Sequence, residues 1–66
     1  MTLSEVLVNI SMGDKISIHD ADGKVVFDGY FSKLKESVPD EKRREIYDKE
    51  VHQIRAYENT IILLLD

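Results

Sequence analysis

Two stretches of alternating apolar and polar residues stand out along this chain of 66 residues. In the first, residues 15–28, Ile16 and Ile18 alternate with polar neighbours, and a second alternating run follows the turn-forming residues Asp20 to Gly23. Because successive side chains of a strand point to opposite faces, this pattern is typical of two strands with one buried face. The stretch therefore predicts a β-hairpin.

The second stretch, residues 53–65, predicts another hairpin that turns near residues 58–59, since asparagine tolerates positive φ. Val51 is out of phase with the alternation that follows it, which predicts a strand start near His52 or a bulge. Residues 61–65 are apolar at every position, so both faces of this strand need cover and we expect it at the centre of the sheet. A helix at the N-terminus would cover one face, and the middle of the chain or another chain would cover the other.

That N-terminal helix is predicted to be short and amphipathic. Thr2 and Glu5 have the spacing of a capping box, in which each side chain bonds the backbone amide of the other residue. Four apolar residues then follow the i, i+3, i+4, i+7 spacing of one helical face: Leu3, Val6, Leu7 and Ile10. Gly13 can adopt the left-handed conformation that closes a helix. We expect two to three turns packed against the sheet, because so short a helix is unstable alone.

Between the hairpins, residues 32–50 are polar, and residues 33–50 hold six acids and six bases. Residues 32–36 predict a single helical turn, and residues 40–47 predict a helix that starts close to a proline. Few apolar residues occur in this segment, so we expect it to lie mostly in solvent and to contribute little to the core. Specificity is therefore expected there.

These elements predict one α+β domain, residues 1–66, in the order αββαββ. We expect a four-stranded antiparallel sheet with strand order 2-1-4-3 and the N-terminal helix packed on one face. The chain has no cysteine, which suits a reducing, cytoplasmic compartment. We also expect a soluble protein, because the N-terminus lacks signal-peptide features and no apolar run approaches the roughly 20 residues that span a bilayer.

Charge and motifs exclude several functions. The formal net charge is −4, which argues against generic nucleic-acid binding. No activated nucleophile, glycine-rich phosphate loop or metal-ligand cluster is present, so neither an enzyme nor a cofactor is expected. The acids of residues 20–28 lack the spacing of an EF-hand, and His19 and His52 occupy polar positions of their strands, so no metal site is predicted.

A protein-binding face is the sharper interpretation of the charged residues, because mixed charge with arginine and tyrosine suits specific protein contacts. The candidate partner-binding residues are Asp20, Asp22, Asp40, Glu41, Arg43, Arg44 and Tyr47. One alternative is a nucleic-acid-binding accessory protein that uses the basic residues of the middle segment: Lys33, Lys35, Lys42, Arg43 and Arg44, with Tyr47 stacking on a base. A second alternative is a structural homodimer whose second copy covers the exposed face of the sheet.

Framework residues recur in a particular order along most of the chain, residues 32–48 excepted. They are Leu3, Val6 and Leu7 after the Met-Thr start, then Ile16-Ser-Ile-His-Asp20 with Gly23, Val26-Phe-Asp-Gly29, Val51-His-Gln-Ile54 and Asn59-Thr-Ile-Ile-Leu63. This order resembles that of short accessory proteins encoded by bacteriophages and prophages. The resemblance implies an inhibitor of a host defence or nucleic-acid-handling protein, such as an anti-CRISPR protein that binds an effector nuclease. It assigns no functional residue.

Overall fold

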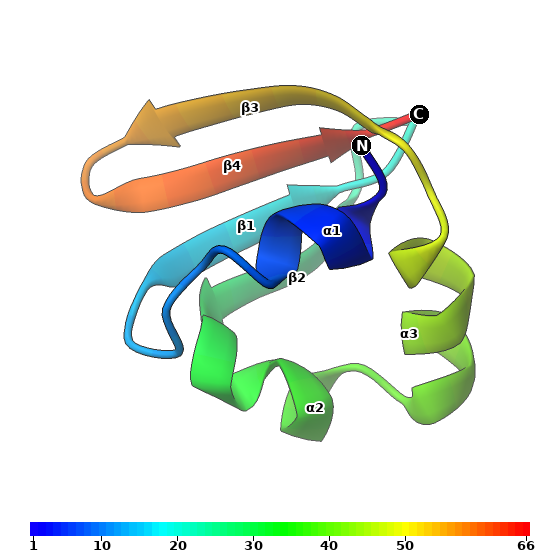
Figure 1. The fold of residues 1–66 in the computed structure, drawn as a ribbon, viewed down its shortest axis with the longest axis horizontal. Coiled ribbons are helices and arrows are strands. Elements are labelled where there is room, and N and C mark those ends of the chain that lie inside the picture. Colours follow the sequence, from blue (N-terminus) through cyan, green and yellow to red (C-terminus); the bar gives the residue numbers. More distant parts are fainter.

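The computed structural model describes all 66 residues, and its order of helices and strands confirms the predicted α+β class (Figure 1). The elements are α1 (Leu3–Leu7), β1 (Lys15–His19), β2 (Val25–Tyr30), η1 (Phe31–Lys33), α2 (Leu34–Ser37), α3 (Asp40–Tyr47), β3 (Val51–Tyr57) and β4 (Thr60–Leu65). The middle segment thus consists of a 3-10 turn and two short α-helices.

The four strands form one sheet in the order β2-β1-β4-β3, which is the order that the apolar last strand predicted. The sheet is mixed, however, because β1 and β4 pair in parallel, with Ile16 opposite Ile61 and Ile18 opposite Leu63. The prediction of a fully antiparallel sheet is therefore wrong. The parallel pairing of β1 with β4 results from the crossover between the two hairpins. The chain leaves the edge strand β2, crosses one face of the sheet through η1, α2 and α3, and enters the other edge strand, β3, in the same direction as β2.

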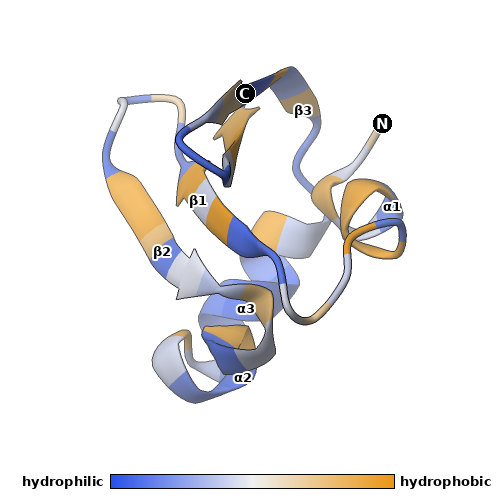
Figure 2. Ribbon diagram, turned by 90° about the vertical axis from the view of Figure 1, so that its left-hand side faces the viewer, coloured by the Kyte–Doolittle hydropathy of each residue, from blue (hydrophilic) through white to orange (hydrophobic).

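The helices lie together on one face of the sheet, and the core lies between the two layers (Figures 1 and 2). This core contains eleven buried side chains: Leu3, Val6, Leu7, Ile16, Ile18, Phe27, Leu34, Val38, Ile46, Leu63 and Leu65. Three of them, Leu34, Val38 and Ile46, belong to the middle segment and are at most 3% exposed. The expectation that this segment contributes little to the core is wrong, because three of its few apolar residues are buried.

The opposite face of the sheet carries no helix. Since α1 and the middle segment share one face, the middle segment does not cover the second face of β4, as one prediction had it. There Ile62 and Leu64 remain half-buried, and Ser17 forms a hydrogen bond with His19, two residues further along β1, at 2.8 Å between Oγ and Nε2. This face is a mixed polar and apolar surface.

Local signals at the N-terminus are confirmed in part. The backbone N–H of Thr2 donates to the Glu5 carboxylate at 2.8 Å, and Thr2 Oγ1 accepts from the Glu5 N–H at 3.3 Å, so the capping box is present. The helix, however, ends at Leu7, and Gly13 has no positive φ, so the predicted extension to residue 13 is wrong. After Leu7 the amides of Asn9 and Ile10 bond the carbonyl oxygens three residues back, which tightens the chain into turns.

The second hairpin follows its sequence signals. Glu58 and Asn59 have φ values of 47° and 62°, and Tyr57 pairs with Thr60 around them, as in a two-residue type I′ turn. The pairing of β3 with β4 shifts between Val51 and Gln53, which confirms a bulge where Val51 is out of phase.

Candidate protein-binding surface

The seven predicted partner-binding residues do not form one patch. Asp20 and Asp22 lie in the β1–β2 turn and border a shallow depression of about 190 Å³ that also includes Lys42 and Lys49. The Asp20 carboxylate accepts the backbone N–H groups of Asp22 and Lys24, each at 2.9 Å. Its first role is therefore to hold the turn.

Four of the predicted residues do come together. Asp40, Arg43, Arg44 and Tyr47 follow the i, i+3, i+4, i+7 spacing on α3, so they share one helical face and line, with Lys35, a depression of about 250 Å³. Three bases and one acid make this depression locally positive on a chain whose net charge is −4. Glu41, exposed between the two faces of α3, lines neither depression.

Arg43 is the most constrained of these side chains. It is only 15% exposed and pairs through Nη2 with the Asp40 carboxylate, while its Nη1 is buried without any hydrogen-bond partner. A buried polar group without a partner costs about 1–3 kcal/mol. This unpaired N–H group therefore opposes folding.

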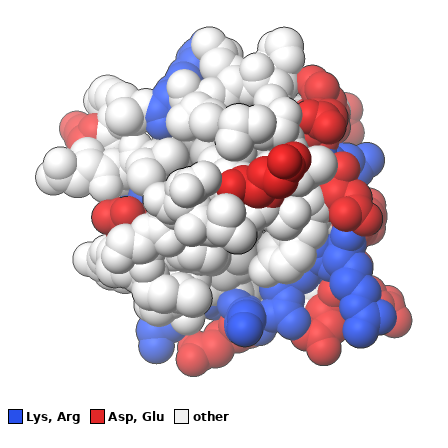
Figure 3. Space-filling model, in the orientation of Figure 1, with Lys and Arg blue, Asp and Glu red and all other residues white.

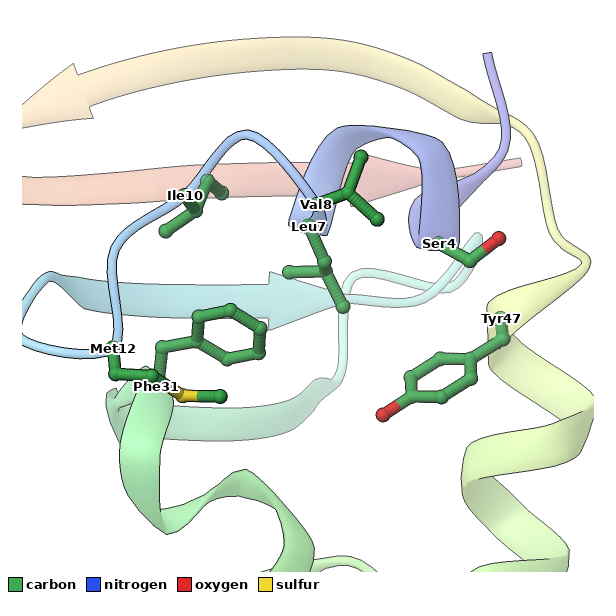
Figure 4. Close-up of a pocket in the computed structure, with 7 residues that line it drawn as sticks. All are labelled: Ser4, Leu7, Val8, Ile10, Met12, Phe31 and Tyr47. Carbon is green, nitrogen blue, oxygen red and sulfur yellow. The ribbon is translucent and has the colours of Figure 1, made fainter.

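Sequence reasoning missed an apolar groove of about 450 Å³ that begins at the same tyrosine (Figure 4). Its lining residues are Ser4, Leu7, Val8, Ile10, Met12, Phe31 and Tyr47. In Figure 4 the Tyr47 ring extends from α3 into the space beside α1, and its hydroxyl points toward the side of the groove that Phe31 and Met12 form. Val8 is 80% and Met12 56% exposed, so the groove presents apolar surface to solvent.

A signal for this groove was present in the sequence. Val8 and Met12 are large apolar residues that lie outside the core-facing stripe of the N-terminal helix, four positions apart, and Phe31 follows directly on the first hairpin. Apolar residues outside the buried stripe are candidates for an exposed contact surface. Only the tertiary structure brings them together in one groove.

Charge is unevenly distributed over this side of the molecule (Figure 3). Charged side chains gather along the lower and right-hand margin of the view, over α2, α3 and the chain that leads to β3, whereas the centre of the view is mostly uncharged apart from acidic atoms over α1. The apolar groove lies toward the mostly uncharged part of this surface and the positive depression toward the charged part, and Tyr47 lines both.

Two ionisable groups have perturbed pKa values, and both lie at the N-terminus. The Met1 ammonium group donates to Glu50 Oε2 at 2.9 Å, and this bond and the carboxylate charge raise the pKa of the amine above its ordinary 8.0. Two hydrogen bonds from Thr2 lower the pKa of the Glu5 carboxyl below its ordinary 4.5. The larger effect comes from the backbone N–H of Thr2 and the smaller from its hydroxyl. Both groups fix the start of the chain and neither belongs to the groove.

No protein-family model, curated protein or solved structure matches this chain. No three side chains of the kind that bind metal ions gather closely enough to hold one. The helices are all too short to cross a membrane, the longest having eight residues.

Proposed function

We propose that this protein is a small protein-binding module that acts by stoichiometric binding through the surface around Tyr47. The main supporting observation is that the apolar groove and the positive depression meet at this one side chain. Tyr47 lines the apolar groove on one side and the depression formed with Lys35, Arg43 and Arg44 on the other. Aromatic residues, methionine and arginine are the side chains enriched in protein interfaces.

The chemistry of the surface defines the partner segment. A large apolar side chain of the partner would fill the groove beside Val8 and Phe31, and one or two neighbouring carboxylates would bond Arg43 and Arg44. The partner is therefore expected to present an acidic segment with an apolar anchor. Binding energy would come chiefly from the buried apolar contacts, and the charges would set the orientation.

A nucleic-acid partner receives less support from the arrangement of the bases. Lys35, Arg43 and Arg44 lie at one depression, whereas Lys42 and Lys49 lie at the other, where Asp20, Asp22 and Glu45 oppose them. Acids thus lie among these bases, whereas phosphate binding relies on a clustered basic patch or stripe.

The target class rests on the resemblance of the framework residues to phage and prophage accessory proteins. We propose, on that basis, that the partner is a bacterial defence or nucleic-acid-handling protein, such as a nuclease, whose activity falls when the module binds. A blocked protein surface suffices for such inhibition, so no catalytic residue is needed.

The test is a pull-down from bacterial lysate, followed by calorimetry and a nuclease assay with the purified partner. Val8→Lys and Arg44→Glu are each expected to weaken binding by about tenfold or more. Val8→Lys places a charge in the apolar groove, and Arg44→Glu replaces a positive charge of the depression by a negative one. Lys33→Glu makes the same charge change as Arg44→Glu in the same segment but outside the depression, and should bind like the wild type. A partner bound equally well by all four proteins would refute the role of this surface, and the recovery of no stoichiometric partner would refute the function.

A further inference from the structure

A long stretch of β3 forms an open edge of the sheet. β3 pairs with β4 on one side, and on its outer side only the start is occupied, where the Val51 N–H donates to the Met1 carbonyl at 2.7 Å and Thr2 bridges to Glu50. Residues 52–57 are all exposed. Unpaired N–H and C=O groups along such an edge are a template for another strand.

The register of the hairpin shows which backbone groups face outward. Tyr57 and Thr60 flank a two-residue turn, so their backbones bond each other. Because bonded and non-bonded pairs alternate along an antiparallel ladder, Arg55 and Gln53 also face β4. The N–H and C=O groups of Ile54 and Ala56 therefore point toward the open edge.

Ile54 adds an apolar side chain to this edge. It lies directly opposite Leu63, which is fully buried, yet Ile54 itself is 54% exposed. The two residues share a face of the sheet, but the helices reach β4 and leave β3 uncovered (Figure 1). An exposed isoleucine thus stands beside its own unpaired backbone groups.

We infer that residues 52–56 of β3, beyond the part of the edge that Met1 and Thr2 occupy, pair in antiparallel fashion with the same residues of a second copy of this chain, about a two-fold axis at Ile54, to give one continuous eight-stranded sheet. In this register the outward N–H and C=O groups of Ile54 bond those of Ile54 in the second copy. Gln53 then lies opposite Arg55, to which it already accepts a hydrogen bond at 3.1 Å within its own strand. A two-fold contact of this kind is closed and self-complementary.

The charges on β3 favour this register over the one with its two-fold axis at Arg55. An axis at Arg55 would also match the backbone alternation, but it would place two arginines directly opposite each other, which is unfavourable. The axis at Ile54 instead places two exposed isoleucines side by side. Because a single edge strand buries less than the roughly 1,200 Å² of a standard interface, the association is expected to be weak and concentration-dependent.

The inference is independent of the proposed function. β3 lines neither the apolar groove nor the positive depression, so both remain open in the dimer, which would carry two partner-binding surfaces. Failure of one proposal leaves the other intact.

Sedimentation equilibrium from micromolar to millimolar protein tests the pairing. The average mass of the wild type should rise toward twice that of the monomer, and Ile54→Lys should weaken self-association by roughly tenfold or more. Ile54→Pro is a second disrupting variant, because the N–H that it removes faces the open edge and not β4. Val8→Lys introduces the same charge at another exposed apolar side chain and should dimerise like the wild type.

Circular dichroism is needed to check that each variant is folded, and amide exchange gives a second readout. The amides of Ile54 and Ala56 should exchange more slowly at dimer-forming concentrations than in dilute protein. A wild type that stays monomeric throughout overturns the inference. So does a dimer that Ile54→Lys and Ile54→Pro leave unchanged, or one that Val8→Lys weakens to the same extent as Ile54→Lys.

Discussion

The guanidinium group of Arg43 contributes little to the stability of the fold. Its Nη1 is buried without a partner, and its ion pair with Asp40 contributes little because that carboxylate is largely exposed. Methionine would keep the packing of the aliphatic part and remove the buried N–H groups. We expect Arg43→Met to raise the free energy of unfolding by roughly 1 kcal/mol while it weakens partner binding.

Urea denaturation and calorimetry with the partner measure these two effects. Arg44→Met is the matched control, since Arg44 is an exposed arginine of the same depression, and its stability should stay within about 0.5 kcal/mol of the wild type. A loss of stability in Arg43→Met would show that the guanidinium contributes to the fold.

Glu5 links the capping box to pH. The hydrogen bonds from Thr2 lower the pKa of Glu5 in the folded protein below its ordinary 4.5. The unfolded chain therefore binds a proton more readily, and the stability that Glu5 contributes is present above pH 4.5 and is lost as the pH falls through the folded pKa. We expect Glu5→Gln to melt at a lower temperature than the wild type at pH 7, with the difference shrinking below pH 4. Thermal melts of both proteins across this range are the measurement, and a difference that does not depend on pH would contradict the prediction.

At the scale of the elements, the middle segment joins the core through single side chains. Leu34 on α2 and Ile46 on α3 are 1% and 3% exposed, and no other residue of either helix is buried. Replacement of a buried leucine or isoleucine by alanine costs about 2–5 kcal/mol. A domain of this length has a total stability of roughly 3–10 kcal/mol, so Leu34→Ala and Ile46→Ala should each leave the protein close to unfolding.

Chemical denaturation checks this prediction, with Glu41→Ala as the control on the exposed side of α3. The control should change stability by less than about 0.5 kcal/mol. Small effects of both core variants would mean that α2 and α3 detach from the sheet without unfolding it.

The turn between β3 and β4 leaves room for stabilisation. Glu58 has φ of 47°, a left-handed conformation that asparagine tolerates better than glutamate. Glu58→Asn should therefore stabilise the protein by about 0.5–1 kcal/mol. Glu58→Gln removes the same charge without this conformational preference, so thermal melts of the two variants separate turn geometry from electrostatics. Equal melting temperatures would exclude the turn as the cause.

The elements that the sequence predicts well are those whose signals are local. The capping box at Thr2, the bulge near Val51 and the turn at Asn59 each depend on a few neighbouring residues, and all three are present. The direction of the second hairpin depends instead on the path of the crossover, which involves the whole middle segment. The antiparallel expectation failed for that reason. The middle segment lies mostly in solvent, as expected, but the expectation that it adds little to the core failed, because its isolated apolar residues give no periodic pattern.

The candidate site shows the same division. Asp40, Arg43, Arg44 and Tyr47 share a helical face by their spacing, so their association could be predicted from the sequence once the helix was assigned. The groove could not be predicted from the sequence. Its lining comes from α1, the loop after it, η1 and α3, and these segments meet only in the tertiary structure.

At the scale of the whole molecule, stability is expected to fall from the centre of the sheet to its edges. β1 and β4 each have a strand on both sides, whereas β3 pairs only with β4. Amides that exchange only through global unfolding should therefore lie in β1 and β4, and their protection should report the full free energy of unfolding.

Hydrogen exchange followed by NMR should also show an alternation along β3 in dilute protein. The amides of Gln53 and Arg55 face β4 in the register and should be protected, whereas those of Ile54 and Ala56 face solvent and should exchange quickly. Ile54→Pro should leave the protection of Arg55 intact, because the amide it removes lies outside the ladder. Fast exchange at Arg55 together with slow exchange at Ile54 in dilute protein would show that the β3–β4 register is shifted by one residue. Such a shift would turn Ile54 and Ala56 to the other face of the sheet and would remove the basis for self-pairing at Ile54.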